Sequence, residues 1–318
     1  MSRVRGAAAA RAATAAFVLF TAVSSAVAVD DEEVLHVAAV QFEVTEDLYL
    51  ENGRFEERVD RFVARATDAG AELVVFPEYI NVFLLFDELG EIIRAADTFE
   101  AASAALSGSP QQDPRAALRQ VVAEQARDTE RRILALWGET ARRHGVAVIA
   151  GSYFAAAPDG TLRNRALVFD AEGRLMHMQD KAFLTPFERG VLGLDAGNWR
   201  VAEPFVIDGF AIGMTICRDS YFSEWESSFA GVDLWVDIRA NGERYTQKVR
   251  ERFAGALAER VASTSVGAGI NASLTGHFLD LIWEGPAYAV DAAGRRTTES
   301  RQATGSGLIH VRVERSGR

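Results

Sequence analysis

Continuous apolar runs alternate along this chain with segments in which apolar residues recur at helical spacing. Residues 35–42 (LHVAAVQF) form a run typical of strands that are covered on both faces, and residues 72–76 (ELVVF) form a second. Between these runs, apolar side chains within residues 47–69 recur every three or four positions, which predicts an amphipathic helix. A second long helix is predicted over residues 116–144.

The rest of the chain is dominated by short predicted strands. Two further helices are predicted over residues 220–230 and 244–263, and the Ala- and Ser-rich segment 95–114 predicts a surface excursion. Helices interleaved with paired strands, all about one core, predict a layered α/β domain with helices outside two sheets. The other predicted strands are residues 146–154, 162–169, 174–180, 205–208, 210–217, 233–238, 265–270, 285–291 and 307–313.

Composition and charge exclude several classes of protein. The 318 residues are 48% hydrophobic and 25% charged, which excludes general disorder and allows a sizeable core. A net charge of −11 disfavours nucleic-acid binding, because phosphates require a basic surface. A single cysteine excludes a disulfide scaffold, and the five histidines lack ligand spacing, so no metal site is expected. The chain contains no phosphate-loop or serine-elbow motif, and no cofactor is expected.

The first 28 residues differ from the rest of the chain. Three arginines are their only charges, an apolar stretch covers residues 12–23, and small residues follow, ending in Ala26, Val27 and Ala28. A basic start, a short apolar middle and an A-x-A end are the parts of an export signal. We therefore predict cleavage near Ala28, one domain over residues 29–318 and a periplasmic or secreted location, with an uncleaved anchor as the alternative. No later segment is apolar for long enough to span a bilayer.

Three polar residues directly follow apolar strands, at the ends where catalytic groups collect in α/β sheets. Glu78 follows ELVVFP, Lys181 follows RLMHMQD, and Cys217 follows FAIGMTI. Taken singly, each is more often structural: a turn glutamate, a solvated lysine and a core cysteine.

Together, however, these three residue types form a chemical set. A cysteine at the start of a predicted helix has its thiolate favoured by the helix dipole. A carboxylate can accept the thiol proton as a general base. A lysine can stabilise the oxyanion that forms when sulfur attacks a carbonyl or nitrile carbon. No histidine is required for this chemistry.

The order Glu, Lys, Cys at strand ends resembles that of the nitrilase superfamily, the carbon–nitrogen hydrolases, and the resemblance covers almost the whole domain. The matching blocks are AAVQF, LVVFPEY around Glu78, HGVAVIAGSYF, the hairpin 164–173, the lysine segment 181–188 with its second glutamate, the cysteine segment 216–224, and the closing strands 231–235 and 284–294. Ser223, Arg218 and the loops 238–243 and 277–284 depart from the common pattern. These positions are expected near the pocket, so they leave the substrate open.

The resemblance implies an αββα four-layer sandwich that carries the three residues at its sheet ends, and a homodimer or higher homo-oligomer. It implies that Cys217 attacks a small-molecule amide, with Glu78 as general base. Lys181 and the backbone N–H of Arg218 would hold the oxyanion, and Glu188 would orient Lys181. Water would then hydrolyse the thioester. The implied activity is hydrolysis of non-peptide carbon–nitrogen bonds, most simply by an amidase.

Several alternatives remain open at this point. Within the same superfamily, the chain could be a nitrilase or an N-acyltransferase, although the lipoprotein-modifying relatives carry membrane spans that this chain lacks. From a different class, it could be an exported binding protein that kept the fold without turnover. A thiol redox protein is disfavoured, because there is no C-x-x-C motif or resolving cysteine.

Overall fold

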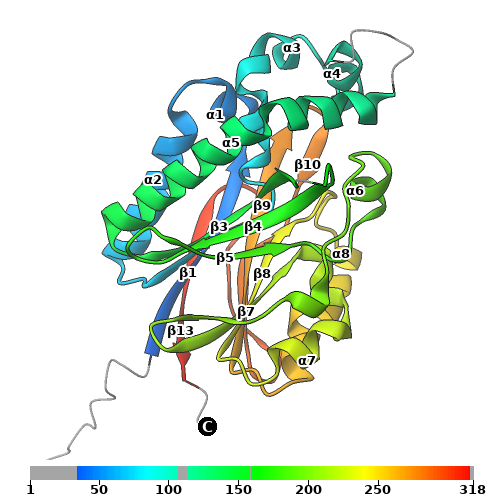
Figure 1. Ribbon diagram of the computed structural model, residues 1–318. Coiled ribbons are helices and arrows are strands. Elements are labelled where there is room, and N and C mark those ends of the chain that lie inside the picture. Colours follow the sequence, from blue (N-terminus) through cyan, green and yellow to red (C-terminus); the bar gives the residue numbers. More distant parts are fainter. Residues whose placement is uncertain (1–33, 107–112, 158, 316–318) are drawn as a thin grey trace, which may run out of the picture. The chain divides into compact units, whose positions relative to one another are not determined.

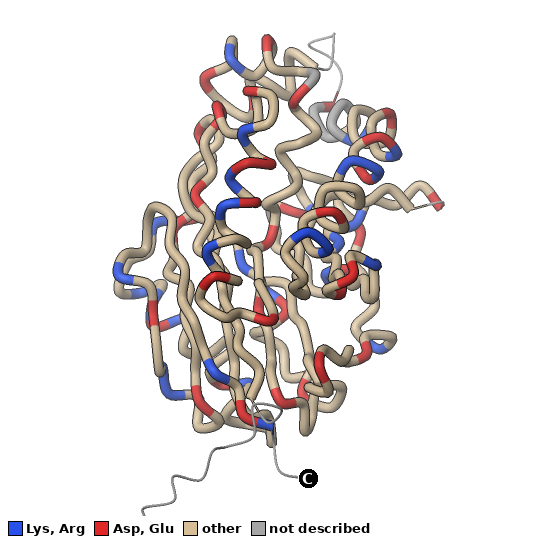
Figure 2. Tube along the Cα trace, turned by 90° about the vertical axis from the view of Figure 1, so that its left-hand side faces the viewer, with Lys and Arg blue, Asp and Glu red and all other residues tan. Residues whose placement is uncertain are grey.

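A computed structural model describes residues 34–106, 113–157 and 159–315 of the chain (Figure 1). The predicted export signal, residues 1–28, lies outside these residues, so its cleavage and the location of the protein stay predictions. No helix in the described ranges combines the length and the apolar character that crossing a bilayer requires. Figure 2 shows acidic and basic residues interspersed along the trace, without a basic face in that view.

The strands form one hydrogen-bonded path. Its order is β5-β4-β3-β2-β1-β9-β8-β7-β6, and β10 to β13 pair beside it. The neighbours from β3 through β1 and β9 to β7 are parallel, so their carboxyl ends lie at one edge. The strands are β1 (Val34–Val44), β2 (Leu73–Phe76), β3 (Ala147–Ala156), β4 (Leu162–Phe169), β5 (Leu175–Asp180), β6 (Phe205–Ile207), β7 (Phe210–Ile216), β8 (Leu234–Ala240), β9 (Ala268–Phe278), β10 (Leu281–Trp283), β11 (Tyr288–Asp291), β12 (Arg296–Glu299) and β13 (Gly307–Glu314).

This path is folded over on itself, so that its two ends meet. The His177 ring on β5 lies 4.9 Å from the Phe205 ring on β6. The Gln179 amide on β5 donates a hydrogen bond of 2.5 Å to the Met214 carbonyl on β7. One interior apolar layer joins the two halves, formed by alternate side chains that include Leu35, Val37, Leu73, Val75, Ile149, Val168, Ile212, Met214, Val236 and Ile238. The two halves are the two central layers of a sandwich.

The other faces of the two halves carry helices, which complete the four layers (Figure 1). On the first half, α1 (Glu46–Leu50), α2 (Arg54–Asp68) and α5 (Pro114–His144) cover a core whose Trp137 and Phe76 rings lie 4.7 Å apart. On the second half, α7 (Glu226–Phe229) and α9 (Glu259–Ala262) share an apolar cluster with Trp235, and α8 (Gln247–Phe253) lies between them in the chain. The predicted αββα sandwich is therefore confirmed.

Most predicted elements are present, but several predicted helices are interrupted. The helix predicted over residues 47–69 is two helices, because Gly53 adopts a left-handed conformation between α1 and α2. The helix predicted over residues 244–263 is broken at Gly255 and Ala256, where the backbone is not helical. Residues 220–230 form two 3₁₀ turns and the short α7 instead of one helix. Tertiary packing overrides propensity in these short segments.

The predicted surface excursion at residues 95–114 contains a helix that the sequence did not predict. It contains α4 (Phe99–Leu106), preceded by α3 (Gly90–Arg94) and followed by the first turn of α5. The strand predicted over residues 265–270 begins at Ala268 and continues to Phe278, and β10 follows it. β12 was not predicted from its polar sequence RTTE. The lysine segment carries one more short helix, α6 (Pro186–Gly190).

Substitution of Gly151 tests how closely β3 packs against the turn that carries Glu78. A Cβ at Gly151 would clash with the Pro77 carbonyl oxygen and the Ile80 side chain, and its φ is +67°. Gly160 shares the positive φ (+78°) but has nothing within 4 Å. We expect Gly151→Ala to lower the free energy of unfolding by about 2–4 kcal/mol. The matched change Gly160→Ala costs about 1 kcal/mol from backbone strain alone. Urea denaturation measures both, and equal losses would contradict the close packing.

Candidate active site

Three strand ends bring the predicted catalytic residues to one cavity. Glu78 lies just past β2, Lys181 directly after β5 and Cys217 directly after β7. All three line a cavity of about 690 Å³. Because β5 and β7 lie near opposite ends of the hydrogen-bonded path, only the folding of the sheet brings Lys181 beside Cys217.

Glu78 is fully buried and has a hydrogen-bond donor at each carboxylate oxygen. Its Oε1 accepts from the Lys181 Nζ at 2.7 Å and from the Asn164 Nδ2 at 2.8 Å, and its Oε2 accepts from the Ala240 N–H at 3.0 Å. Burial raises the pKa of Glu78, and the nearby Glu188 raises it further, although Lys181 opposes both. The carboxylate is therefore fixed in place and readier to take up a proton than an exposed glutamate.

Lys181 lies between two buried carboxylates at the wall of the cavity. Its Nζ is 2.7 Å from Glu78 and 2.9 Å from Glu188, and all three side chains are at most 1% exposed. Burial lowers the pKa of Lys181, but the two carboxylates outweigh burial and hold the pKa well above its usual value. The lysine therefore stays charged throughout the neutral range.

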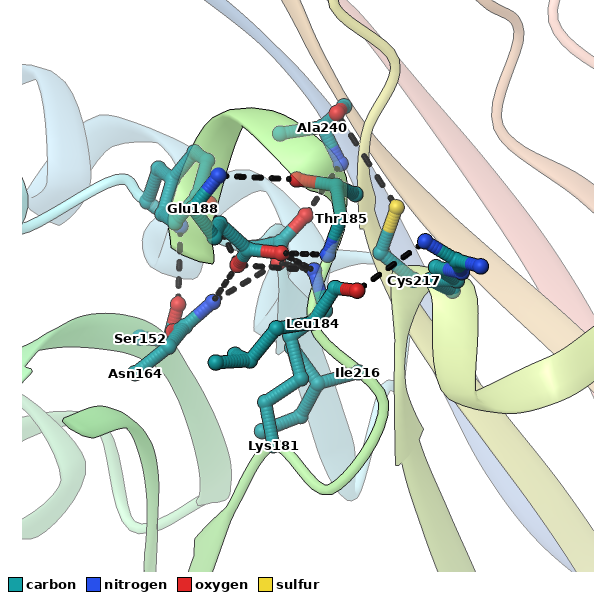
Figure 3. A network of polar contacts seen from close by, with 12 residues as sticks. Ser152, Asn164, Lys181, Leu184, Thr185, Glu188, Ile216, Cys217 and Ala240 are labelled. Atoms are coloured by element: carbon teal, nitrogen blue, oxygen red, sulfur yellow. Dashed lines mark hydrogen bonds and ion pairs between the residues drawn. The ribbon is translucent and has the colours of Figure 1, made fainter. Parts of the chain in front are cut away.

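The Glu188 carboxylate is held in place at the N-terminus of α6, the helix in which it lies. Thr185 caps α6 in a capping box, and its N–H donates to Glu188 Oε2 at 2.8 Å. The Tyr79 hydroxyl and the Asn164 amide donate to Oε1 at 2.6 and 3.1 Å. Although burial alone would raise the pKa of Glu188, Lys181 and these donors lower it. Figure 3 shows Glu188 and Thr185 on one side of Lys181, with Asn164 beneath them.

Cys217 begins a tight turn rather than the predicted helix. It has a φ of +53° and starts a 3₁₀ turn of five residues, Cys217–Tyr221. Its Sγ lies 4.0 Å from the Ala240 carbonyl oxygen. Burial raises the pKa of the thiol, and the Glu78 charge raises it further. The expectation of a thiolate favoured by a helix dipole is therefore wrong, because the turn is short and burial raises the pKa of the thiol. A base must remove the thiol proton.

Asp237 and Arg239 are a buried pair that the sequence analysis did not single out. Both side chains are at most 1% exposed, and their closest atoms are 2.6 Å apart. Arg239 also donates to the Ser220 Oγ at 2.8 Å, and Ser220 donates to the Cys217 carbonyl at 2.8 Å. The next residue, Ala240, donates to Glu78. The end of β8 therefore holds both the turn of Cys217 and the carboxylate of Glu78. Two charges within the apolar strand LWVDIRA were the available signal.

Two further positioning residues stand within motifs that the sequence analysis quoted. Asn164 on β4 donates to both Glu78 and Glu188. Asp219 is fully buried, and its carboxylate accepts from the N–H groups of Phe183 at 2.8 Å and Ala182 at 3.2 Å. It thereby ties the chain after Lys181 to the turn of Cys217. Burial raises the pKa of Asp219 to about 8.

Arg218 lines the same cavity, directly after Cys217. Its guanidinium donates to the Leu184 carbonyl at 3.0 Å and lies 5.7 Å from the centre of the Phe222 ring. That the backbone N–H of Arg218 helps to hold an oxyanion stays a prediction. Within the described ranges, no three His, Cys, Asp or Glu side chains are grouped as metal ligands would be.

Comparison with known proteins identifies a family and a shared fold. A family model described as carbon–nitrogen hydrolase matches residues 36–229. A carbon–nitrogen hydrolase from Helicobacter pylori G27 superposes with a TM-score of 0.66 at 13% identity, covering 89% of this chain and 90% of that one. A mutant amidase of the nitrilase superfamily from Nesterenkonia AN1 gives a TM-score of 0.61 at 20% identity, covering 87% and 90%.

A second mutant of the Nesterenkonia amidase was solved in complex with acrylamide. It gives a TM-score of 0.62 at 19% identity and covers 88% of this chain and 90% of that one. No curated protein sequence is significantly similar to this chain. The structural likenesses show the fold, and the family model covers more than half of the sequence. The chain therefore belongs to the carbon–nitrogen hydrolase family, and it is a hydrolase that acts on carbon–nitrogen bonds.

Proposed function

We propose that this protein is an amidase that cleaves a small-molecule amide through a thioester on Cys217. The observation that carries the proposal is the Glu78–Lys181 ion pair, which lines the same cavity as the only cysteine of the chain. A thiol, a buried base and a fixed cation are the three groups that acyl transfer requires.

In the first half of the reaction, Glu78 takes the proton of the Cys217 thiol as sulfur attacks the amide carbonyl carbon. The carbonyl oxygen becomes an oxyanion, which Lys181 and the backbone N–H of Arg218 stabilise. Glu78 then gives the proton to the amide nitrogen, the carbon–nitrogen bond breaks, and ammonia or an amine leaves. The acyl group remains on sulfur as a thioester.

In the second half, Glu78 takes a proton from a water molecule as the water oxygen attacks the thioester carbon. The second oxyanion is stabilised by the same two donors. When it collapses, the carbon–sulfur bond breaks, the proton returns to sulfur, and the carboxylic acid leaves. Glu78 therefore serves both halves as a proton carrier, and the net reaction consumes one water.

The electrostatics of the site support these roles. The thiol has a raised pKa, so proton transfer must accompany attack, and the base must be in reach throughout. The pKa of Glu78 is raised as well, which brings it closer to neutrality and improves its match as base and then acid. Lys181 keeps its charge beside two carboxylates and cannot compete as a proton donor at neutral pH.

The structural neighbours support an amide rather than a nitrile. Mutants of the Nesterenkonia amidase were solved with acrylamide and with butyramide, and one carries a covalent addition of the acetamide moiety of fluoroacetamide at its active-site cysteine. These ligands were observed with the Nesterenkonia amidase, not with this chain. The shared fold makes amides the first substrates to test on this chain.

Removing the nucleophile tests the proposed reaction directly. We expect Cys217→Ala to lower kcat/KM for primary amides by about 10⁴-fold or more, because no thioester can form. Ammonia release from a panel of primary amides, with matched nitriles, measures the loss. Turnover near the wild-type rate in Cys217→Ala would contradict the thioester route. Faster ammonia release from nitriles than from their amides would identify a nitrilase instead.

The pH profile tests Glu78 as the base. Because the unprotonated carboxylate is the active form, kcat/KM should rise with pH through a value above the ordinary pKa of glutamate. Glu188→Gln removes a negative neighbour that raises the pKa of Glu78, so the acid limb should move to lower pH. The exposed Glu124→Gln is the control and should leave the limb in place. An acid limb that does not move in Glu188→Gln would contradict this assignment.

The buried pair on β8 predicts a large effect on stability. We expect Arg239→Met to lower the free energy of unfolding by about 3–5 kcal/mol, because it leaves the Asp237 charge buried without its cationic partner. The double change Asp237→Asn with Arg239→Met should recover part of the loss. Arg131→Met, which removes an exposed pair with Asp128, is the control and should change little. Urea denaturation distinguishes these outcomes, and a double variant less stable than Arg239→Met would contradict the pairing.

A further inference from the structure

The cavity is much larger than a short amide requires. Its volume of about 690 Å³ lies in the range of pockets that enclose drug-sized ligands, about 300–1,000 Å³. Glu78, Lys181 and Cys217 account for only a small part of its wall. The remaining wall therefore indicates what else the substrate carries.

Aromatic and aliphatic side chains dominate that wall. Phe187 comes from α6, Phe222 follows the nucleophile turn, and Leu281 and Trp283 come from β10. The Phe222 ring stacks on Phe183 at 3.8 Å between ring centres, with an angle of 5° between their planes. These side chains offer flat apolar surfaces of the kind that bind apolar ligand groups.

The β10 wall is fixed by its packing. β10 pairs with β9 in a tight hairpin, Leu281 opposite Phe278, and the Trp283 ring lies 5.5 Å from the Phe83 ring. Asp280, which also lines the cavity, accepts the Phe99 N–H of α4 at 2.7 Å. The wall is thus preformed, and binding against it requires little ordering of side chains.

Most charged groups of the wall are already engaged by the protein. Lys181 lies between its two carboxylates, Arg239 pairs with Asp237, and Arg252 pairs with Glu243. Arg218 donates to a backbone carbonyl and lies over the Phe222 ring. A charged substrate group would have to compete with these contacts, whereas an apolar group would not.

The apolar surface continues outward from the cavity along α6. Phe187 is 37% exposed, and Val191, which follows the same helix, is 42% exposed. They are two of only seven large hydrophobic residues exposed to this degree in the part of the chain that the structure describes. A ligand that extended past the cavity would meet further apolar surface there.

From this wall we propose that the substrate is an uncharged amide whose acyl group is bulky and apolar, such as an arylalkyl group, and that β10 and Phe187 select it. This proposal rests on the proposed amidase function and narrows its substrate class. The acyl group lies against Leu281, Trp283 and Phe187 while its carbonyl carbon is at Cys217. It keeps these contacts in the thioester, after the amine has left.

A series of amides tests the proposal, with kcat/KM from ammonia or amine release. We expect 3-phenylpropanamide to exceed acetamide by about 100-fold or more, with gains of about fourfold for each added methylene in the aliphatic series. Leu281→Ala and Phe187→Ala should each lower the ratio of the two rates by about tenfold. Leu175→Ala, a matched leucine on β5 outside the cavity wall, should leave the ratio unchanged.

Other outcomes of this series would overturn the proposal or the amidase function itself. Acetamide turned over as well as 3-phenylpropanamide would overturn the proposal while leaving the amidase function intact. Faster cleavage of 3-(4-carboxyphenyl)propanamide than of its methyl ester would overturn the proposal that the substrate is uncharged. Faster cleavage of N-(2-phenylethyl)acetamide than of 3-phenylpropanamide would overturn the assignment of the bulky group to the acyl side. If no amide of the series is cleaved, the amidase function itself fails.

Discussion

The burial of Lys181 between Glu78 and Glu188 is the interaction on which the site depends. One cation holds two buried carboxylates within 2.9 Å, and neither carboxylate could be buried charged without it. Asn164 and Tyr79 complete the coordination of these oxygens. The same ion pair fixes the position of the base and keeps the lysine charged, so positioning and electrostatics come from one set of contacts.

This cluster can exist only because the sheet is doubled over. The parallel strands present their carboxyl ends at one edge, and folding the path brings the ends of β2, β5 and β7 to a single cavity. β8 then links the two halves of the site. Its Ala240 N–H donates to Glu78, while Asp237 and Arg239 support the turn of Cys217 through Ser220. Cys217 and Glu78, the proposed nucleophile and base, are thus held by neighbouring residues of one strand.

The electrostatic account of the nucleophile differs from the one that the sequence favours. Sequence reasoning placed Cys217 at the start of a helix, where a dipole would stabilise a thiolate. The structure gives it a short 3₁₀ turn in buried surroundings, which raise the pKa of the thiol. In the proposed mechanism Glu78 activates the thiol, and burial raises the pKa of Glu78. The proton of the site therefore moves between the Cys217 thiol and the Glu78 carboxylate, and no helix dipole stabilises a thiolate.

The sequence alone determined the layered α/β fold, because apolar runs and helical periodicity record which faces are buried. It also pointed to Glu78, Lys181 and Cys217, because polar residues directly after apolar strands are visible in one dimension, whereas Glu188 was predicted only through the family resemblance. Only the tertiary structure decided how helices break at positions such as Gly53, and which charges pair inside strand β8. The cavity wall was likewise beyond the sequence, because its side chains come from segments far apart in the chain. Their proximity depends on sheet folding and hairpin geometry, and periodicity does not record either.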